Sequence, residues 1–580
     1  MTAAERVWAA FDFPELPPGR DLRVRGRFLE PPQRVLATTD PGAAADVVRA
    51  AAAAADAGAW VVGGVGYAAR WDPAGTAAPG GAPAAHFEVY RSPPAPWPDE
   101  SAELPELDWR AEAGLAGGLQ PEAAIRQVLA LIGAGECYQV NLATRWHALP
   151  PPGTDGLHRL FLGLASAQPG GYSLYSALAG VASVSPELFF DISGDRITTQ
   201  PMKGTAAASD DPGDLLRSPK ERAENLMIVD LLRNDLGRVC EPGTVTVERL
   251  FELHRLPTVW QLTSTVAGRA RPGTGLAEVF AALAPCGSVT GAPKLAAMRV
   301  IEALESGPRG WYCGALGVLR PGGRATFSVA IRTVTADPDG TLSCGVGSGI
   351  VADSDPRLEV AEWRAKTAFL GGRPLRALET MLLADGVLVR RQAHLHRLAA
   401  TCAAFGLELD PAAVTAALDL TVAAHPAGRH RVRLLAGEGD PQVTVAAAPP
   451  AGKPVVLEVA AEPLDTAGWL RPVIRNKTTH REHYRRLLAG AAAGVFDVIC
   501  HTPGGELTEC TTGNLAVQLD GEWFTPPEAV GLLPGVLRAE LLGSGRLRER
   551  NLTVADLDRA GGLAFLNSLR GWCPASLRPH

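Results

Sequence analysis

The stretch Gln200-Pro201-Met202-Lys203-Gly204-Thr205 places a lysine beside a glycine, directly after a predicted strand at Arg196 to Thr199. Two further strands are predicted just before it, at Gly180 to Val184 and Leu188 to Ile192, and the three are typical of an antiparallel run. A lysine that acts as a nucleophile must be neutral, which burial or cationic neighbours can arrange. Judged by itself, however, Lys203 is more often an exposed lysine in a turn.

The elements around this stretch do not alternate regularly between strand and helix. Ala223 to Val239 and Ala292 to Glu305 have the spacing of amphipathic helices. Strands are predicted further along the chain, at Ala315 to Leu319, Ala325 to Val334 and Thr341 to Val346. Runs of strands with helices between them predict an α+β fold and not an alternating parallel sheet.

A break in this pattern predicts two domains, residues 1–371 and residues 375–580. Glu359 to Leu370 is predicted to be a helix, and Gly371-Gly372-Arg373-Pro374 follows it as a short linker. Leu375 to Leu388 then has the pattern of a hairpin, with Ala384-Asp385-Gly386 as its turn. A chain of 580 residues is long enough for two such domains, each with its own hydrophobic core.

The composition is that of a globular protein, with 46% hydrophobic and 20% charged residues. The formal net charge is −7 and no basic block stands out, so neither a nucleic acid nor a membrane is expected as a partner. The nine cysteines form no Cys-x-x-Cys pair, which argues against a zinc ribbon or a disulfide scaffold. No signal-peptide pattern is recognised at Met1 to Arg6, and we expect a cytoplasmic protein.

Two Glu-x-x-Glu pairs stand on predicted helices, Glu221 with Glu224 and Glu359 with Glu362. This spacing puts both carboxylates of a pair on one face of the helix. If the two faces met, they would form a site of hard oxygen ligands, which suits Mg²⁺. The commoner explanation of such pairs is a solvated helix surface.

Two glycine-rich segments are candidates for anion binding. Cys286 to Lys294 precedes a predicted helix, and Gly345 to Ile350 is predicted to form a loop after a strand. Such loops can offer backbone N–H groups to an anion. Tight turns that bind nothing are the more frequent case.

The second domain contains four features that stand out, although each by itself is most simply explained as structural. They are Lys477 after a predicted apolar strand at 473–474, Glu509 in Leu507 to Asn514, Arg397 in His394-Leu395-His396-Arg397, and Gly531 to Arg538. The last of these is predicted to turn into the N-terminus of a helix, where a phosphate can bind.

Seven segments of the first domain carry a joint signal. In chain order they are Tyr138 to Leu142, Ser185-Pro186-Glu187, Pro201 to Thr205, Ala223 to Asp235, Gly287 to Lys294, Tyr312 to Gly317 and Gly347 to Pro356. Together they resemble the chorismate-utilising enzymes, the family of anthranilate synthase, isochorismate synthase and aminodeoxychorismate synthase component I. The resemblance covers about residues 136–370 and implies the chorismate-binding-enzyme fold, with antiparallel sheets flanked by helices.

Lys203 distinguishes between members of this family, because anthranilate synthases carry alanine at this position and aminodeoxychorismate synthases carry lysine. The resemblance therefore implies a covalent route, in which Lys203 attacks C2 of chorismate while Glu187 protonates the departing C4 hydroxyl. Ammonia then adds at C4 and displaces the lysine.

The resemblance also implies a set of ligand-binding residues. For chorismate these are Gly204, Thr205, Tyr312, Arg332, Gly347, Ser348 and Gly349. The implied metal is Mg²⁺, held by Glu224 and Glu362 with Glu221 and Glu359 close by. Arg332 suits a carboxylate because its guanidinium can donate two parallel hydrogen bonds.

The features of the second domain stand in the order found in the fold-type IV pyridoxal-phosphate enzymes. This family includes branched-chain and D-amino acid transaminases and aminodeoxychorismate lyase. Leu378-Glu379-Thr380 and Thr525-Pro526-Pro527 extend the resemblance, which covers about residues 375–580. Leu566 to Trp572 would close the substrate side of the implied site.

Each of the four features gains an implied role from this resemblance. Lys477 would bind pyridoxal 5′-phosphate and move protons, and Glu509 would hold the pyridine nitrogen in its protonated form. Arg397 and the backbone N–H groups near Val536 and Leu537 would bind the phosphate group.

The pairing of the two domains predicts successive reactions on one compound. The first would convert chorismate to 4-amino-4-deoxychorismate, and the second would release pyruvate to give 4-aminobenzoate for folate biosynthesis. The sequence contains no Gly-x-Cys-x-Gly elbow of a glutaminase, so we expect the ammonia from a separate glutamine amidotransferase subunit. The resemblance of the second domain also makes a homodimer possible.

Three alternatives stay open. In one alternative, the second domain is a branched-chain or D-amino acid transaminase. In another, the front domain resembles anthranilate synthase component I. In the third, the chain is a non-catalytic scaffold that binds chorismate or a glutaminase subunit. The residues of the second domain do not separate a lyase from a transaminase, and residues 1–130 carry no recognisable motif.

Overall fold

A computed structural model describes residues 6–15, 23–67, 83–97, 102–150, 156–207, 212–255, 259–371, 375–405, 407–437, 439–466 and 470–578. The contacts divide the chain into two compact units, the first consisting mainly of residues up to Gly372 and the second of Arg373–His580. The expected linker residues 372–374 lie outside the described residues. In the ranges given above, no helix has the length and apolar character that a membrane crossing requires.

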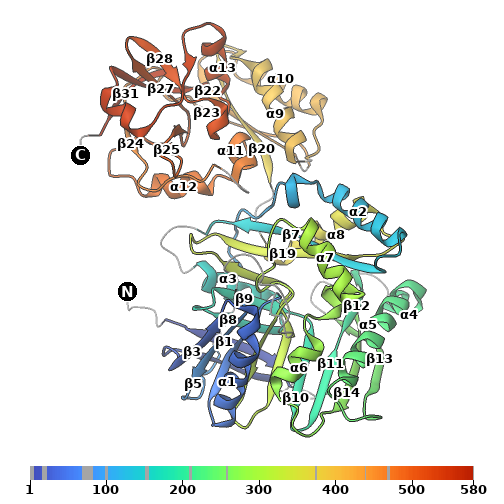
Figure 1. Ribbon diagram of the computed structural model, residues 1–580. Coiled ribbons are helices and arrows are strands. Elements are labelled where there is room, and N and C mark those ends of the chain that lie inside the picture. Colours follow the sequence, from blue (N-terminus) through green and yellow to red (C-terminus); the bar gives the residue numbers. More distant parts are fainter. Residues whose placement is uncertain are drawn as a thin grey trace. The chain divides into compact units, whose positions relative to one another are not determined.

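The described part of the first unit contains two large sheets, in which the strands pair antiparallel (Figure 1). The first sheet has the order β15 (Gly291–Ala292), β7 (Gln139–Ala148), β19 (Leu342–Ile350), β18 (Thr333–Ala336), β9 (Val181–Ser185), β8 (Tyr172–Ser176), β1 (Ala9–Pro14), β2 (Arg23–Phe28), with β6 (Arg110–Ala111) beside β7. The second sheet has the order β12 (Met202–Ala207), β14 (Val259–Arg269), β11 (Arg196–Gln200), β10 (Leu188–Ser193), β17 (Ala325–Val329), β16 (Ala315–Leu319), β4 (Trp60–Val65), β5 (Ala85–Tyr90), β3 (Arg34–Thr38), with β13 (Thr246–Arg255) beside β14.

The helices of the first unit lie on the outer faces of these sheets. They are α1 (Ala44–Asp56), α2 (Pro121–Gly133), α3 (Gly156–Ala167), α4 (Pro212–Arg217), α5 (Pro219–Gly237), α6 (Leu276–Leu283), α7 (Lys294–Leu304) and α8 (Pro356–Lys366), with short 3₁₀ turns at η1 (Pro41–Ala43), η2 (Ala116–Gly118), η3 (Gly287–Val289) and η4 (Thr367–Leu370). Apolar side chains of α1, α5 and α6 pack on the second sheet, and those of α2, α3, α7 and α8 pack on the first. Between the sheets, Phe11 and Phe13 of β1 share a buried cluster with Leu316 and Val318 of β16.

Two predictions for this unit are wrong. The single strand expected at 325–334 is two strands, because β17 belongs to the second sheet and β18 to the first. The chain crosses between the sheets at Arg332, whose φ of 48° interrupts the extended backbone. The loop expected at Gly345 to Ile350 is part of β19, where Gly347 pairs with Ala143 and Gly349 with Asn141.

The described part of the second unit has a four-stranded and an eight-stranded sheet. The smaller has the order β21 (Val387–Leu388), β20 (Arg376–Ala384), β22 (Arg429–Gly437), β23 (Gln442–Ala447), and the larger β26 (Leu507–Cys510), β25 (Asp497–His501), β24 (Val455–Val459), β31 (Gly571–Leu577), β30 (Gly562–Asn567), β27 (Asn514–Leu519), β28 (Glu522–Thr525), β29 (Arg548–Glu549). The helices are α9 (Arg391–Phe405), α10 (Pro411–Ala424), α11 (Arg471–Arg475), α12 (Glu482–Ala489) and α13 (Val536–Gly543), with 3₁₀ turns at η6 (Glu528–Val530) and η7 (Val554–Arg559). Apolar side chains of α9 and α10 pack on the smaller sheet.

Local sequence signals explain some of these elements and mislead at one. The hairpin turn is confirmed at Asp385 and Gly386, whose φ values of 47° and 75° are those that a tight two-residue turn requires. Val473 and Ile474, however, lie in the short helix α11 and not in a strand. Two adjacent apolar residues fit a buried helical turn as well as a strand, so a segment this short does not distinguish a helix from a strand. Strand runs with irregularly placed helices nevertheless confirm the predicted α+β class.

Candidate active sites

Glu187 is a buried acid between β9 and β10, with 4% of its surface exposed. The Ser288 hydroxyl of η3 donates to Glu187 Oε1 at 2.8 Å, and the backbone N–H of Met202 also donates to this carboxylate. Burial raises the pKa of Glu187 to about 7, against the opposing effects of the Ser288 hydrogen bond, the Lys203 charge and the Met202 N–H. Near neutral pH, a substantial fraction of this carboxyl group is therefore protonated and can donate a proton.

Lys203 lies on β12 and reaches towards β19, a strand of the other sheet. A Cβ atom on Gly349 would lie 3.5 Å from Lys203 Nζ and 2.5 Å from Gln139 Nε2. Any side chain at this position would therefore crowd the space beside the lysine amine. Lys203 and Glu187, which the sequence predicts as partners, are close enough for the lysine charge to act on the acid.

The other residues predicted to bind chorismate have their own contacts. The Tyr312 ring leaves no space for a side chain at Gly345, where a Cβ would lie 2.4 Å from its Cγ atom. Arg332 donates from Nη1 to Gln168 Oε1 at 2.8 Å, and burial lowers the pKa of its guanidinium. Gly204 has a φ of 83°, and the side chain of Thr205 lies outside the described residues.

The predicted residues of β19 are tied to helix α8. The Gly347 carbonyl accepts a hydrogen bond from Lys366 Nζ at 2.9 Å. Ser348 Oγ accepts from Trp363 Nε1 at 2.7 Å and donates to Glu359. The hydroxyl of Ser348 thus positions α8 in this structure.

The four glutamates predicted to bind a metal lie on two helices, α5 and α8. On α5, Glu221 Oε2 would lie 3.0 Å from a Cβ on Gly204. On α8, Glu359 accepts from Ser348 and Ser354, and Glu362 pairs with Lys366 at 2.7 Å. Within the described residues, the structure contains no group of three or more aspartate, glutamate, histidine or cysteine side chains that could hold a metal ion. Glu221, Glu224, Glu359 and Glu362 are therefore not assembled into a ready-made site.

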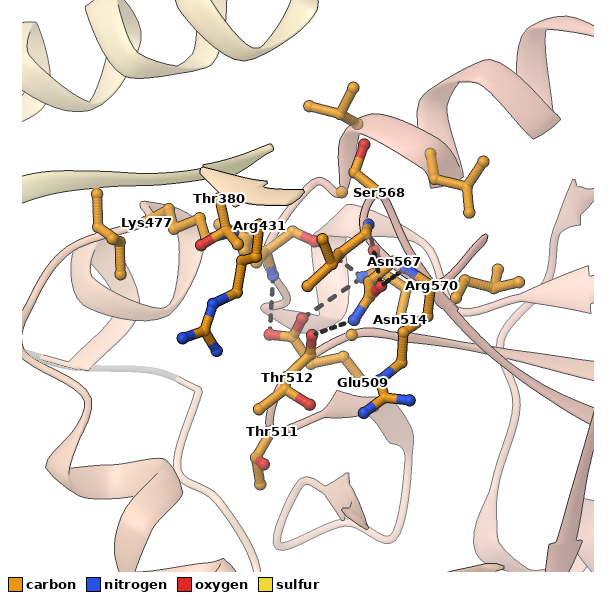
Figure 2. Close-up of a pocket in the computed structure, with 18 of the residues that line it drawn as sticks. Thr380, Arg431, Lys477, Glu509, Thr511, Thr512, Asn514, Asn567, Ser568 and Arg570 are labelled. Carbon is orange, nitrogen blue, oxygen red and sulfur yellow. Dashed lines mark hydrogen bonds between the residues drawn. The ribbon is translucent and has the colours of Figure 1, made fainter. Parts of the chain in front are cut away.

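The second unit contains a cavity of about 680 Å³, shown in Figure 2. Its lining includes every residue that the sequence analysis assigned to pyridoxal phosphate, namely Lys477, Glu509, Arg397, Val536 and Leu537. In Figure 2, Lys477 lies on one side of the cavity and Ser568 and Arg570 on the other. The cavity has the size of a pocket for a small molecule.

Lys477 is held at the wall of the cavity by its own backbone. The Leu378 N–H of β20 donates to the Lys477 carbonyl at 2.8 Å, which joins the lysine segment to the smaller sheet. Burial lowers the pKa of the Lys477 amine to about 7, with help from the charges of Arg397 and Arg481 and against those of Glu379 and Glu509. A neutral amine at physiological pH is what covalent bonding to a carbonyl carbon requires.

Glu509 is a buried acid on β26, with 3% of its surface exposed. Tyr484 donates to its Oε1 at 2.6 Å, and the Leu533 N–H donates to the same oxygen at 2.9 Å. Asn514 Nδ2 lies 3.4 Å from Oε2 (Figure 2). Burial raises the pKa of Glu509 to about 7, and the two hydrogen bonds oppose this shift. A cationic ring nitrogen beside Glu509 would favour its ionised form.

Arg397 is held in place by a buried carboxylate that the sequence analysis did not assign to the site. Glu379 accepts from Arg397 Nε and Nη2, both at 2.8 Å, and Arg397 Nη1 donates to the Pro534 carbonyl at 3.1 Å. His394 Nδ1 lies 2.7 Å from Glu379 Oε2, and its Nε2 lies 2.9 Å from Ser568 Oγ. Three of the five guanidinium N–H groups are used in this way, which leaves two for a ligand.

The N-terminus of α13 lines the same cavity as Arg397. Gly535 is its N-cap residue, and a Cβ at this glycine would lie 1.9 Å from Asn514 Oδ1. The N–H groups of Val536 and Leu537 belong to the first turn, where a helix offers them no internal acceptor. Together with Arg397, this turn can hold an anion.

Four residues of this site escaped the sequence analysis as participants: Glu379, His394, Tyr484 and Asp497. Asp497 accepts from Thr511 and Thr512 and so shapes the loop after Glu509. For two of them the available signal was the charge itself, since Glu379 stands in the middle of the mainly apolar strand β20 and Asp497 begins β25. A charge in a strand pattern indicates a buried partner, but the sequence does not show which.

Comparisons with known proteins match each of the two units to a protein family. Residues 121–371 match the family model of chorismate binding enzymes, and residues 376–577 match that of class IV amino-transferases. Aminodeoxychorismate synthase component 1 of Klebsiella aerogenes is 43% identical over 246 residues, which are 41% of this chain and 54% of that protein. Anthranilate synthase component 1 of Streptomyces coelicolor is 41% identical over 242 residues, 40% of this chain and 46% of that protein. The chain thus spans about half the length of these relatives.

A solved structure supports the fold of the first unit. A Bacillus anthracis protein, described as a 2,3-dihydroxybenzoate-specific isochorismate synthase, aligns with a TM-score of 0.50 and 20% identity, over 64% of this chain and 96% of that chain. The expected chorismate-binding fold followed by a class IV amino-transferase fold is confirmed. The chain therefore joins a domain of the chorismate-binding-enzyme family to a domain of the class IV amino-transferase family.

Proposed function

We propose that this chain makes 4-aminobenzoate from chorismate in two steps, one in each domain. The observation that carries the proposal is the presence in one chain of two sites, each with one lysine and one buried acid. Lys203 and Glu187 stand in the first, and Lys477 and Glu509 in the second. The product of the first reaction would carry the amine that the second site needs, which is the chemical link between the domains.

In the first step, the Lys203 amine would attack C2 of chorismate while the Glu187 carboxyl group protonates the departing C4 hydroxyl as water. The pKa of about 7 at Glu187 supports this role, because an ordinary glutamate would already be ionised. Ammonia would then form the bond to C4, and the electrons of the ring would expel Lys203 from C2. The sum is chorismate plus ammonia giving 4-amino-4-deoxychorismate plus water.

Arg332 and the small residues of β19 would position the ring. The half-buried guanidinium of Arg332 suits a carboxylate, because it can donate two parallel hydrogen bonds. Gly204, Thr205, Tyr312, Gly347, Ser348 and Gly349 are proposed as further binding residues. Gly349 would matter by leaving the space beside Lys203 open.

Mg²⁺ is proposed as the metal of the first domain. Its carboxylate donors are hard oxygen ligands, and Glu221 and Glu359 flank the region of Gly204 and Ser348. Mg²⁺ usually takes only one or two protein carboxylates and fills its other positions with substrate oxygens and water. Glu224 and Glu362 would supply these two, and Glu362 would exchange Lys366 for the metal. The metal would offset the charge of the ring carboxylate.

The cavity of the second domain fits pyridoxal 5′-phosphate. Arg397 and the first turn of α13 offer donors to a phosphate, and Glu509 has an acceptor for a protonated ring nitrogen. When bound, this cofactor supplies an electron sink for the carbon next to the substrate nitrogen. Lys477, as a neutral amine, would take the C4 proton of the substrate. Breaking of the C3–O bond would release pyruvate, and the ring would become aromatic as 4-aminobenzoate.

The ammonia is proposed to come from a separate glutamine amidotransferase subunit. The matched relatives are named as a component 1, and the sequence has no glutaminase elbow of its own. Free ammonium would replace this subunit in vitro.

The deciding experiment is mass spectrometry of the products from chorismate, ammonium and Mg²⁺, with and without pyridoxal phosphate. We expect 4-amino-4-deoxychorismate without the cofactor, and 4-aminobenzoate plus pyruvate with it. Anthranilate as the sole product would reject the proposal for the first domain. A separate assay supplies an amino acid and 2-oxoglutarate. Amino transfer in that assay, together with no pyruvate release in the first one, would make the second domain a transaminase.

A complementation experiment then separates the two sites. Neither the Lys203→Ala nor the Lys477→Ala variant should form 4-aminobenzoate alone, whereas a mixture of the two should restore it. Failure of the mixture, although each variant retains its other activity, would argue against a freely diffusing intermediate.

A further inference from the structure

The second unit has another cavity, which adjoins the one that contains Lys477. It measures about 870 Å³ and is lined by Arg376, Arg433, Arg481 and Arg485, together with Leu435, Gln442 and Thr479. Arg433 and Arg481 line both cavities, so the two cavities adjoin at these side chains. We call these four arginines the arginine groove. The described lining of this cavity includes no acidic residue.

The strand β22 places Arg433 on the open face of the smaller sheet. Val432 and Leu434 on either side of it are fully buried, and Arg433 itself is exposed. This alternation is what a strand with one buried face produces. Arg433 pairs in register with Thr380 of β20, which lines the lysine cavity. The strand therefore fixes Arg433 where the two cavities meet.

Arg481 is fixed at the same junction from the other side. Its Nη2 donates to the Thr511 carbonyl, and its guanidinium lies 4.6 Å from the centre of the Tyr484 ring. Arg485, one helical turn further along, pairs with Glu482 at 2.5 Å and keeps 47% of its side chain exposed. A surface ion pair of this kind is weak, so a ligand carboxylate can exchange for Glu482.

The floor of the groove is bound to the lysine segment. The Arg376 N–H donates to Thr479 Oγ1 at 3.1 Å, and the Thr479 N–H donates to the Arg376 carbonyl at 2.9 Å. Thr479 follows two residues after Lys477. A ligand held in the groove would therefore be close to the residues that position the reactive amine.

We propose that the arginine groove binds a carboxylate of a dicarboxylate substrate and directs its amine into the lysine cavity. The inference rests on the proposed function, because 4-amino-4-deoxychorismate carries a ring carboxylate and an enolpyruvyl carboxylate. Arginine forks suit carboxylates, and a groove with only positive charges attracts a dianion more strongly than a monocarboxylate. The groove thus selects for the second carboxylate.

The test uses the full-length chain and the non-reactive dicarboxylate 3-(carboxymethoxy)benzoate in equilibrium dialysis. The double variant Arg433→Gln/Arg485→Gln should bind it about 10-fold more weakly than the wild type, the loss expected from removing charge-assisted hydrogen bonds. Binding of the monocarboxylate 3-methoxybenzoate should change less than about 2-fold. The first domain is the same in both proteins, so the difference reports on the second.

The matched control is Arg429→Gln/Arg486→Gln, which removes the same charge from the same strand and helix at positions that line neither cavity. It should bind the dicarboxylate as the wild type does. An equal loss in the control, or no loss in the groove variant, would overturn the inference. A thermal melt of each variant checks that it folds.

The outcome is separable from that of the proposed function. If 4-aminobenzoate forms but the groove variant binds the dicarboxylate normally, only the groove assignment fails. If no 4-aminobenzoate forms and the groove variant still loses dicarboxylate binding, the groove stands and the reaction assignment fails.

Discussion

Arg397 and Glu379 form a buried two-pronged ion pair, in which Nε lies 2.8 Å from Oε1 and Nη2 lies 2.8 Å from Oε2. The partners come from α9 and β20, and His394 approaches the same carboxylate at 2.7 Å. Burial acts to raise the pKa of Glu379, but the Arg397 charge and the hydrogen bonds from Arg397 and His394 hold it well below its usual range. The arginine assigned to the phosphate is thus oriented by a second residue that does not itself line the cavity.

This pair predicts a loss of cofactor affinity in a Glu379→Gln variant. The substitution removes the charge that orients Arg397, and we expect the dissociation constant for pyridoxal phosphate to rise about 10-fold or more. Titration of the absorbance near 400 nm measures it, and circular dichroism checks the fold. Glu540→Gln is the control, because Glu540 also pairs with an arginine, Arg390, but on the surface. Equal effects of the two substitutions would remove the positioning role of Glu379.

A Lys203→Ala variant should lose 4-aminobenzoate formation from chorismate and ammonium. The covalent step needs the amine, so we expect a fall of at least about 100-fold in kcat, with anthranilate as the product that can replace it. Lys453→Ala, an exposed lysine of the second unit, should leave the rate unchanged. Product analysis by mass spectrometry measures both, and undiminished 4-aminobenzoate from Lys203→Ala would contradict the covalent role.

The pKa of about 7 at Glu187 predicts a basic limit to the first reaction. The protonated form is the acid, so at constant free ammonia the rate should fall as pH rises through 7. Ser288 donates to the carboxylate and lowers its pKa, so Ser288→Ala should move this limb to higher pH. Ser193→Ala, at an exposed position, is the control. A limb that does not move would show that Glu187 is not the titrating acid.

Cofactor binding should weaken as pH falls through 7. Both Glu509 and Lys477 have a pKa of about 7, and below it the carboxylate and the neutral amine that the cofactor requires are lost together. Tyr484 donates to Glu509 and lowers its pKa, so Tyr484→Phe should move this limb to higher pH. Dissociation constants for pyridoxal phosphate between about pH 6 and 8 measure the effect. Tyr138→Phe, at a 71% exposed ring, should not alter the profile.

A methyl group at Gly349 should impair the first reaction. Its carbon would lie 2.5 Å from Gln139 Nε2 and 3.5 Å from Lys203 Nζ, so it would displace the lysine or occupy the space of the ring. We expect Gly349→Ala to lower kcat/KM for chorismate about 100-fold. Gly133→Ala in α2 meets nothing within 4 Å and should have no such effect. Kinetics with chorismate as the varied substrate compare the two, and equal values would refute the crowding argument.

Local patterns in the sequence determined most element positions and the second site. The run of strands before Lys203, the hairpin turn at Asp385-Gly386 and the helix after Gly535 follow from alternation, turn residues and capping. Lys477, Glu509, Arg397, Val536 and Leu537 were placed by motif and line one cavity. Each motif consists of residues that are neighbours in the sequence, so it can be recognised without knowing which distant residues it contacts.

Only the tertiary structure decided how distant residues pair. Ser288 meets Glu187, Glu379 meets Arg397, and the glutamates of α5 and α8 form no group of three or more within the described residues. The same holds for Gly345 to Ile350, which lies in a strand because β7 pairs with it. Periodicity shows which side of an element is buried, but it does not contain the register between elements far apart in the chain. That register, set by packing, is what gives the buried acids their partners.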